Sequence, residues 1–429
     1  MRRYPSSAPI DAFFLLMTRL LLTMAVLLAV EWYVFQAVRT AAAPWSAGAQ
    51  RLAAWGYWGL TGATILGVLL LATMRGRGAA PAPWTTYAFA SLLALWLSKI
   101  VVVVFLLADD LIRLGKVALN AVASGPGPYD PSRSRFLALL GLGAAAIPFG
   151  ALVWGMVKGA TDFRVRRLTL RYPNLPPAFD GFRILQISDM HVGSYHDNQE
   201  PLLRAAHLIN QEAADLVVMT GDLVNNVATE AEPHLDALSR IRSKYPLLSI
   251  LGNHDYGDYV QWETPGAKRH NLDTLKAHHK AAGWNLLLNE HRILEKNGER
   301  IAVLGVENWG ARLGFPRYGN LAAAHRGTEE VPFKVLLSHD PSHWDAEGQV
   351  TERFQDIDLT LSGHTHGMQF GVNLPQFKWS PVQYAYKHWA GLYEKGRQRL
   401  YVNTGLGYIG YPGRVGFLPE ITVIELKRG

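Results

Sequence analysis

The stretch Phe182–His191 reads FRILQISDMH, an apolar run that leads directly into an aspartate and a histidine. A short apolar, β-branched run of this kind is typical of a buried β-strand. Polar side chains that follow such a strand lie at the edge of the sheet, where open α/β sheets place their functional sites. Asp189 and His191 are therefore the first members of a candidate site.

Four further apolar runs end in the same way. Each is followed by a polar motif rich in Asp, Asn or His, and the motifs are Gly221-Asp222, Gly252-Asn253-His254-Asp255, His339-Asp340-Pro341 and Gly363-His364-Thr365-His366. Between the first two strands, residues 199–213 show the apolar spacing of a helix. The pattern predicts an α/β domain in which five loops meet at one edge.

The motifs supply two aspartates, one asparagine and four histidines as candidate metal ligands: Asp189, His191, Asp222, Asn253, His339, His364 and His366. The chain has no cysteine, so thiolate sites are excluded. Mixed oxygen and imidazole donors suit Mn, Fe or Zn, and seven donors suit two ions that share a carboxylate. Such a pair can hold a bridging hydroxide for in-line attack at phosphorus.

The ordered motifs D-M-H, G-D-L-V-N, G-N-H-D, S-H-D-P and G-H-T-H resemble those of the calcineurin-like metallophosphoesterase superfamily. The flanking sequences LPPAFDG at 175–181 and NTGLG at 403–407 resemble its membrane-attached branch. The likeness covers about residues 165–429. It implies that residues 181–429 form an α/β domain with two mixed β-sheets between helices, preceded by a linker and first strand at 159–180.

The resemblance also implies two ligand groups. The first metal would be held by Asp189, His191 and His366, and the second by Asn253, His339 and His364. Asp222 would bridge the two ions. An Asp-x-His or a His-x-His arises often by chance, but five such blocks in the family's order do not.

For the G-N-H-D motif, roles beyond the metals follow from the same resemblance. His254 would give a proton to the leaving oxygen, Asp255 would orient it, and Asn253 and His254 would contact the substrate. Asn225 stands where many relatives have Asp, at a position that is not usually a ligand. Arg414, in a glycine-rich loop, is a candidate donor to a substrate phosphate, with a solvated arginine as the alternative.

The net charge of +7 is unevenly distributed. Residues 1–158 contain 13 basic and five acidic residues and no histidine, whereas residues 159–429 have a net charge of −1 and all 15 histidines. A nucleic-acid binder would carry its basic excess in the soluble part, so this class is disfavoured. Basic residues around apolar segments indicate a membrane protein instead.

Four apolar segments predict an all-α transmembrane bundle over residues 1–158, with helices at about 13–38, 52–74, 86–108 and 136–157. A cleaved signal peptide is the alternative for the first helix, but the other three would still retain the chain in the membrane. With the N-terminus inside, flanking Lys and Arg number nine inside and six outside. The catalytic domain is therefore expected on the cytoplasmic side.

Two ionisable residues, Glu31 and Lys99, interrupt the first and third of these segments. Each would lie about a dozen residues deep in its helix. A charge at mid-membrane is costly unless it is paired or wet. We hypothesise a Glu31–Lys99 pair inside the bundle, and snorkelling of each side chain is the alternative.

These features predict a membrane-anchored, metal-dependent hydrolase of phosphoester or pyrophosphate bonds. Because membrane confinement raises the effective concentration of anything in the same leaflet, a lipid-linked substrate is favoured. The resemblance suggests UDP-2,3-diacylglucosamine, an intermediate of lipid A biosynthesis. Soluble phosphodiesters or phosphomonoesters are the enzymatic alternative, and a non-catalytic receptor or transporter subunit that binds phosphorylated ligands is the alternative of another class.

Overall fold

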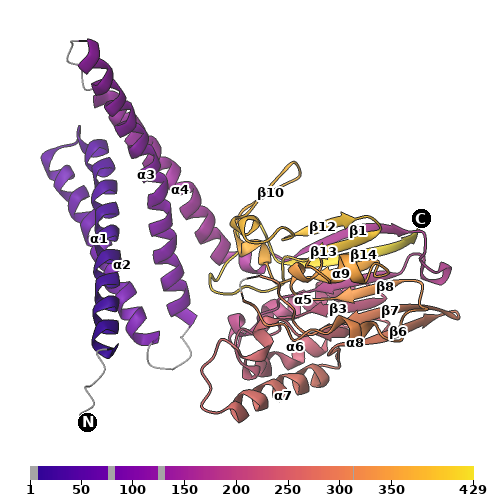
Figure 1. Ribbon diagram of the computed structural model, residues 1–429. Coiled ribbons are helices and arrows are strands. Elements are labelled where there is room, and N and C mark those ends of the chain that lie inside the picture. The colour runs from indigo at the N-terminus through magenta and orange to yellow at the C-terminus, as the bar shows by residue number, and fades with distance from the viewer. Residues whose placement is uncertain (1–7, 76–82, 124–130, 313) are drawn as a thin grey trace, which may run out of the picture. The chain divides into compact units, whose positions relative to one another are not determined.

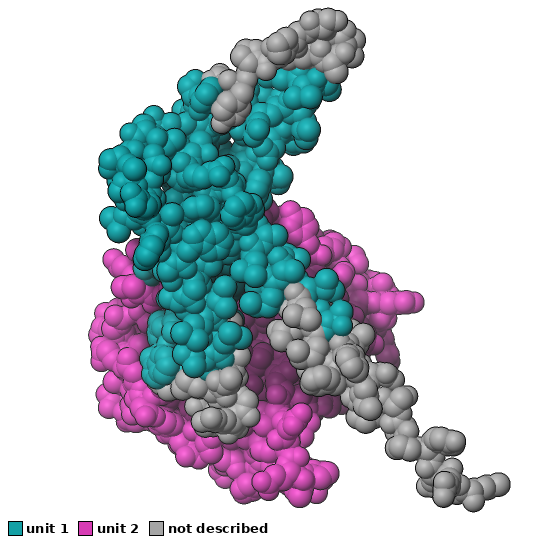
Figure 2. Space-filling model, turned by 90° about the vertical axis from the view of Figure 1, so that its left-hand side faces the viewer, with its two compact units in different colours: residues 1–153 teal, residues 154–429 magenta. Residues whose placement is uncertain are grey.

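The computed structural model describes residues 8–75, 83–123, 131–312 and 314–429. It divides into two compact units, residues 1–153 and 154–429 (Figure 2). The second unit therefore includes Trp154–Val157, the last turn of the final long helix. Arg2, Arg3 and Arg77, which contribute to the expected orientation, lie outside the described residues.

The first unit consists of four long helices (Figure 1), which are α1 (Ala8–Ala42), α2 (Ala47–Arg75), α3 (Pro83–Ala123) and α4 (Pro131–Val157). All four predicted helices are present, and each extends beyond its predicted limits. Three stretches of the described residues are long and apolar enough to cross a membrane: Leu22–Ala42, Trp84–Leu119 and Pro131–Val157. The α2 helix is not among them, so its crossing stays a prediction.

The bundle core is built from small and β-branched side chains of three helices. Val34 and Ala37 of α1 pack with Val102 and Leu106 of α3 and with Ala138 of α4, and all five are buried. Alanines at such contacts let helix backbones approach closely, which is how membrane helices gain van der Waals contact when lipid is as apolar as they are.

Glu31 and Lys99 form a buried ion pair between α1 and α3, as hypothesised from the sequence. Lys99 Nζ lies 2.6 and 2.7 Å from the two carboxylate oxygens of Glu31. From α2, Tyr57 and Thr61 donate hydrogen bonds of 2.7 and 2.8 Å to the same carboxylate. The snorkelling alternative is excluded because Glu31 is only 3% exposed and Lys99 only 8%.

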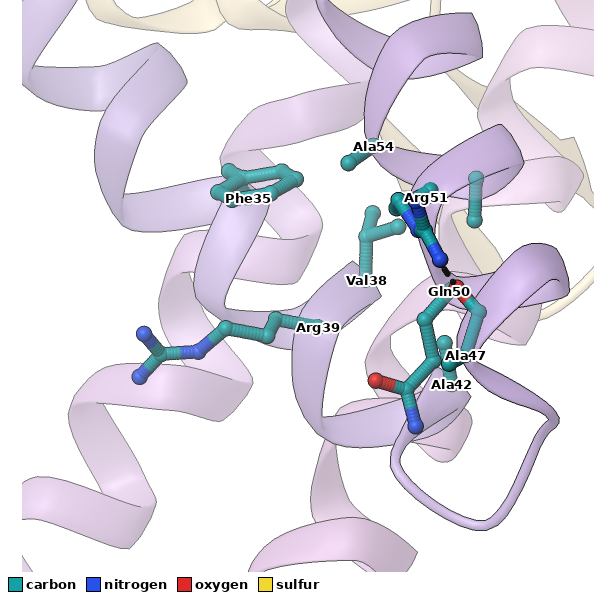
Figure 3. Close-up of a pocket in the computed structure, with 9 residues that line it drawn as sticks. Phe35, Val38, Arg39, Ala42, Ala47, Gln50, Arg51 and Ala54 are labelled. Atoms are coloured by element: carbon teal, nitrogen blue, oxygen red, sulfur yellow. Dashed lines mark hydrogen bonds between the residues drawn. The ribbon is translucent and has the colours of Figure 1, made fainter.

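A cavity of 340 Å³ lies between the end of α1 and the start of α2 (Figure 3). Phe35, Arg39, Gln50 and Arg51 are among the residues that line it, and Arg51 donates to the carbonyl oxygen of Ala47. Both arginine side chains are exposed. The cavity lacks the Asp and His donors of a metal site and presents the basic helix flanks that the sequence predicted.

The second unit contains two six-stranded mixed sheets. The first has the order β1-β14-β2-β3-β4-β5 and the second the order β12-β13-β9-β8-β7-β6. Their bounds are β1 Arg164–Tyr172, β2 Arg183–Ile187, β3 Leu216–Thr220, β4 Leu248–Ile250, β5 Asn285–Leu286, β6 Glu290–Lys296, β7 Glu299–Gly305, β8 Lys334–Leu337, β9 Leu359–Ser362, β12 Gly391–Lys395, β13 Gln398–Val402 and β14 Glu420–Arg428. The five strands predicted before the polar motifs are present as β2, β3, β4, β8 and β9.

Helices cover the outer faces of both sheets. A core that includes Ile184 and Val218 of the first sheet and Val335 and Leu359 of the second lies between the sheets. A separate core joins the first sheet to α5 (Glu200–Gln211), α6 (Leu235–Ser239) and α7 (Pro265–Ala281), and another joins the second sheet to α8 (Leu321–His325) and α9 (Val350–Arg353). The expected arrangement of two mixed sheets between helices is confirmed.

The basic residues Arg164, Arg166 and Arg167, which follow the last long helix, belong to strand β1, which pairs with β14 in parallel. Its arginines have acidic partners within the unit: Arg166 lies 3.4 Å from Glu420, and Arg167 lies 2.5 Å from Glu212. From Leu168 to Tyr172, partly or fully buried residues alternate with exposed ones, as the two-residue period of a strand predicts.

We predict that Glu31→Gln and Lys99→Met each lower the thermal stability of the detergent-solubilised chain. Removing one partner of a buried ion pair leaves the other charge uncompensated, at a cost of about 3–5 kcal/mol. The double variant should lose much less than the sum of the single losses, as measured by thermal unfolding. Strictly additive losses would contradict a direct pair, and Asp236→Asn, in an exposed pair with Arg240, is the control.

Candidate metal centre

The site is built at the carboxyl ends of five strands that come from both sheets. Strand β2 leads to Asp189 and His191, β3 to Asp222, and β4 to Asn253. From the second sheet, β8 leads to His339 and β9 leads to His364 and His366. Since the two sheets face each other, their strand ends bring ligands to one place from opposite sides.

The first ligand group is Asp189, His191 and His366, all buried. The Nε2 atoms of His191 and His366 are 3.1 Å apart, and His366 Nε2 lies 3.2 Å from Asp189 Oδ1. At this separation the two imidazole nitrogens face one shared point, which a metal ion could occupy in place of a proton. This group coincides with the first metal site that the resemblance implied.

The second group contains Asp222, His339 and His364. His339 Nε2 is 3.1 Å from Asp222 Oδ2 and 3.2 Å from Asn253 Oδ1, and His364 Nδ1 is 2.7 Å from the same Asn253 oxygen. Asp222 Oδ2 also lies 3.6 Å from His191 Nε2 of the first group. Asp222 thus stands between the two groups, where a bridging carboxylate belongs.

These spacings fit two divalent ions. Ligand atoms about 2.1 Å from one ion, at angles of about 90–110°, lie roughly 3.0–3.4 Å apart. Most of the distances within each group fall in or near this range. The donor set and its spacing therefore fit a binuclear centre, and they do not distinguish Mn, Fe and Zn.

The backbone at the site is strained. Five of the seven candidate ligands have positive φ angles: Asp189, His191, Asp222, His364 and His366, with values from 43° to 73°. The left-handed region costs a residue with a Cβ about 1–2 kcal/mol. Such strain persists only when the surroundings fix the chain, and it clusters at functional sites.

Two glycines allow the loops to approach each other. A Cβ on Gly252 would lie 2.2 Å from Asp222 Oδ1, and a Cβ on Gly363 would lie 1.9 Å from Ser188 Oγ and 2.2 Å from Asp189 Oδ2. No side chain fits at such distances. Gly252 and Gly363 are thus needed for the close packing of their loops against the ligands.

Partners on the far side of the rings orient the histidines. His339 donates from Nδ1 to the carbonyl oxygen of Thr220 at 2.7 Å, since a carbonyl can only accept. His191 Nδ1 lies 3.0 Å from Asn225 Oδ1. Each contact leaves Nε2 free to bind a metal, which is the usual arrangement around ligating histidines. Asn225 is a functional residue that the sequence did not identify.

The pKa values of the candidate ligands are shifted by burial and by one another. Burial, followed by the neighbouring His366, lowers the pKa of His191 to about 3, so this imidazole is neutral at pH 7. Burial opposes a charge on His339, but the Asp222 carboxylate overrides it and raises the pKa of His339 to about 10. Burial also works against the Asp222 carboxylate, yet the imidazoles hold its pKa below the usual range. A metal ion would replace the proton on His339.

His254 lies beside the metal groups and is partly exposed. Its Nδ1 donates to the carbonyl oxygen of Asn225 at 2.6 Å, and its ring centroid is 5.0 Å from that of His191. Its backbone N–H donates to Asp222 Oδ1 at 2.9 Å. With Nδ1 occupied, the Nε2 position is the one available for proton transfer.

Asp255 does not contact the His254 ring, contrary to the role expected for it. Its carboxylate accepts hydrogen bonds from the backbone N–H groups of Asp222, Leu223, Val224 and Gly252, at 2.8–3.3 Å. The carbonyl of Asn225 orients the ring instead. Asp255 therefore connects the loop at residues 222–224 with the loop at Gly252 through these hydrogen bonds. The motif spacing alone does not indicate this role.

Arg414 also differs from its predicted role. It is completely buried, and its guanidinium donates to the carbonyl oxygens of Thr404, Gly407 and Phe417. Its Nη2 lies 3.1 Å from His366 Nδ1. These contacts leave no exposed N–H for a substrate phosphate, so Arg414 supports the C-terminal loop and the His366 ring.

Two facing mixed sheets with paired Asp and His groups at their strand ends define a binuclear metallohydrolase. The family model for calcineurin-like phosphoesterases matches residues 182–368. A second model, described as the probable calcineurin-like phosphoesterase transmembrane domain, matches residues 17–160. The chain belongs to the calcineurin-like metallophosphoesterases that carry a transmembrane domain.

Similar proteins carry names of the same class. The chain is 32% identical over 297 residues to the uncharacterized metallophosphoesterase YkuE of Bacillus subtilis, covering 65% of this chain and 94% of the relative. It is 30% identical over 332 residues to the transmembrane protein with metallophosphoesterase domain of Danio rerio, covering 74% and 68%. Phosphodiesterase YaeI of Escherichia coli is 26% identical over 251 residues, covering 57% and 82%.

We predict that the purified chain binds about two divalent ions, measured by elemental analysis after dialysis against Mn²⁺ or Zn²⁺. Asp222→Ala should reduce the content toward zero, because its carboxylate belongs to both groups. Asp189→Ala should retain about one ion. The exposed α7 variant His270→Ala should keep both. An Asp222→Ala chain that still holds two ions would contradict the bridging role.

Asp255→Asn should destabilise the fold and weaken metal binding. The carboxylate accepts hydrogen bonds from four backbone N–H groups, and the amide nitrogen of Asn cannot accept the bonds that one of its oxygens accepts. Hydrogen bonds to charged groups contribute about 1.5–3 kcal/mol each. We expect a loss of about 3 kcal/mol in unfolding free energy by chemical denaturation. His254→Ala should change stability by less than about 1 kcal/mol. Equal effects of both variants on turnover, with no change in stability, would favour the ring-orienting role instead.

Proposed function

We propose that this membrane-associated metallophosphoesterase hydrolyses a phosphodiester or pyrophosphate bond of a phosphorylated, lipid-linked substrate. The observation that carries the proposal is the convergence of seven metal-ligand side chains, with key donor atoms 2.7–3.6 Å apart, at strand ends of both sheets. The name of the Escherichia coli relative, a phosphodiesterase, supports the diester class.

Asp189, His191 and His366 would hold one ion, and Asn253, His339 and His364 would hold the other, with Asp222 shared by the two groups. When bound, the ions would supply Lewis acidity for the attack of water at phosphorus. Asn253 Nδ2 donates to the hydroxyl of Tyr259 at 2.8 Å, which fixes the amide so that its oxygen faces His339 and His364.

His254 is the proposed proton donor to the leaving oxygen. Its Nδ1–H is held by the Asn225 carbonyl, so in the protonated ring the Nε2–H is the one free to move. General acid catalysis of this kind contributes about 10²–10⁴-fold. The centroid of the Tyr259 ring lies 4.6 Å from that of the His254 ring, so Tyr259 limits the rotation of His254 on one side.

The membrane attachment supports a lipid-linked substrate, because a shared leaflet raises the local concentration of both partners. None of the three relatives described above is named for hydrolysis of UDP-2,3-diacylglucosamine, so we propose only the class of lipid-linked phosphorylated substrates. The excess of inside-flanking basic residues supports placing the catalytic unit on the cytoplasmic side. A carboxyl-terminal reporter that is active only in the periplasm would reverse that placement.

The expected result is metal-dependent release of nitrophenol from bis(p-nitrophenyl) phosphate. Asn253→Ala should abolish turnover through loss of the second ion, and His254→Ala should lower kcat by about 10²–10⁴-fold while both ions stay bound. His270→Ala should behave as the parent chain. No turnover with Mn²⁺, Fe²⁺ or Zn²⁺ in folded, metal-loaded protein would rule out hydrolysis and favour a receptor that only binds phosphorylated ligands.

A further inference from the structure

A two-stranded hairpin near the metal centre has an uncovered apolar face. Its strands are β10 (Val372–Leu374) and β11 (Phe377–Trp379), with Leu374 opposite Phe377 and Val372 opposite Trp379. Directly opposed residues lie on one face of a hairpin. On that face Leu374 is 59% exposed, Phe377 56% and Val372 38%.

The other face of the hairpin is turned toward the protein. It carries Asn373 and Lys378, which are also directly opposed. Lys378 donates to the carbonyl oxygen of Ala390, and its Nζ lies 5.1 Å from the centroid of the Trp389 ring. The polar side of the hairpin therefore contacts the domain through the Lys378 ammonium, whereas the side chains of the apolar side are exposed, which is the reverse of the usual arrangement in a soluble protein.

The hairpin begins beside a loop that is hydrogen-bonded to the end of α4. Gly371 N donates to the carbonyl oxygen of Val415 at 3.0 Å, and Val415 N donates to that of Gln369 at 2.8 Å. In the same loop, Arg414 N donates to the carbonyl oxygen of Gly155 in the last turn of α4, at 3.2 Å. The α4 stretch Pro131–Val157 is one of the apolar spans, so this loop lies where a span ends.

We infer that the hairpin is a membrane contact, and that its apolar face, Val372, Leu374 and Phe377, enters the interfacial layer of the bilayer that α4 crosses. Each strand has three residues, so the tip stands roughly 10 Å from its base, close to the depth of a headgroup layer. Trp379 at the base is the kind of residue that membrane interfaces favour. Figure 1 shows the hairpin projecting from the body of the second unit.

This contact would place the metal centre at the lipid surface. His366, in the first ligand group, lies only six residues before Val372, and Met368 between them is 56% exposed. A second copy of the chain is the competing occupant of the apolar face. A hydrogen bond to the last turn of α4 holds that loop at the end of a membrane span, which favours the bilayer as the occupant. The inference does not depend on turnover.

The chain has no cysteine, so a single introduced cysteine gives a unique site for a spin label. Leu374→Cys and Phe377→Cys in the full chain would be labelled and placed in nanodiscs of equimolar phosphatidylethanolamine and phosphatidylglycerol. Ile293→Cys is the matched control, since Ile293 is an exposed apolar residue, 37% exposed, on β6 at the edge of the second sheet. Power saturation then compares collisions with oxygen and with a water-soluble nickel complex.

The labels at 374 and 377 should show at least a severalfold higher ratio of oxygen to nickel collisions than the label at 293. The same ratio at all three positions would overturn the inference. Strong dipolar broadening at 377, absent at 293, would place a second copy on this face and would also overturn it. Because the labelled side chains are exposed, parent-like thermal unfolding of each variant confirms that the fold is intact.

Discussion

The carboxylate of Asp222 connects both ligand groups of the metal centre with the loop that carries His254. One oxygen lies between His339 and His191, and the other accepts the backbone N–H of His254. The backbone N–H of Asp222 is in turn held by Asp255. Ligands from both sheets and the candidate acid are thus positioned relative to one oxygen pair, and a shift of that loop would move all of them together.

This arrangement sets two demands on the chain. Five of the candidate ligands take left-handed backbone angles, and glycines must stand where neighbouring loops touch the ligands. At about 1–2 kcal/mol for each strained residue, the loops alone would not hold this shape. Backbone hydrogen bonds to Asp255 offset part of that cost, and bound cations would offset more by removing the repulsion between ligands. The fold therefore preforms the centre, and bound metal ions would complete it.

Much of this was predictable from the sequence because the relevant signals are local. Apolar runs such as 216–220 have the period and length of strands, and the polar motifs come directly after them. The sequence could not predict the contacts of Asp255 and Arg414, because the same spacing is compatible with several hydrogen-bond partners and only the packed loops select one. Asn225 was missed since its motif position is not a ligand, although its carbonyl and side chain orient two histidines. The hairpin at β10–β11 was missed because three-residue strands carry too little periodicity to detect.

The Glu31–Lys99 pair illustrates the same limit in the helical unit. Two isolated charges at similar depth made a pair conceivable, but the pair would be a poor source of stability if only two groups took part, because desolvation offsets the attraction. Tyr57 and Thr61 change that balance by filling the remaining acceptor sites of the carboxylate from a third helix. The network fixes α1, α2 and α3 in one register, since sliding any helix by one turn would leave a charge unpaired in an apolar surrounding. Specificity of helix pairing, more than net stability, is therefore what the buried charges give the bundle.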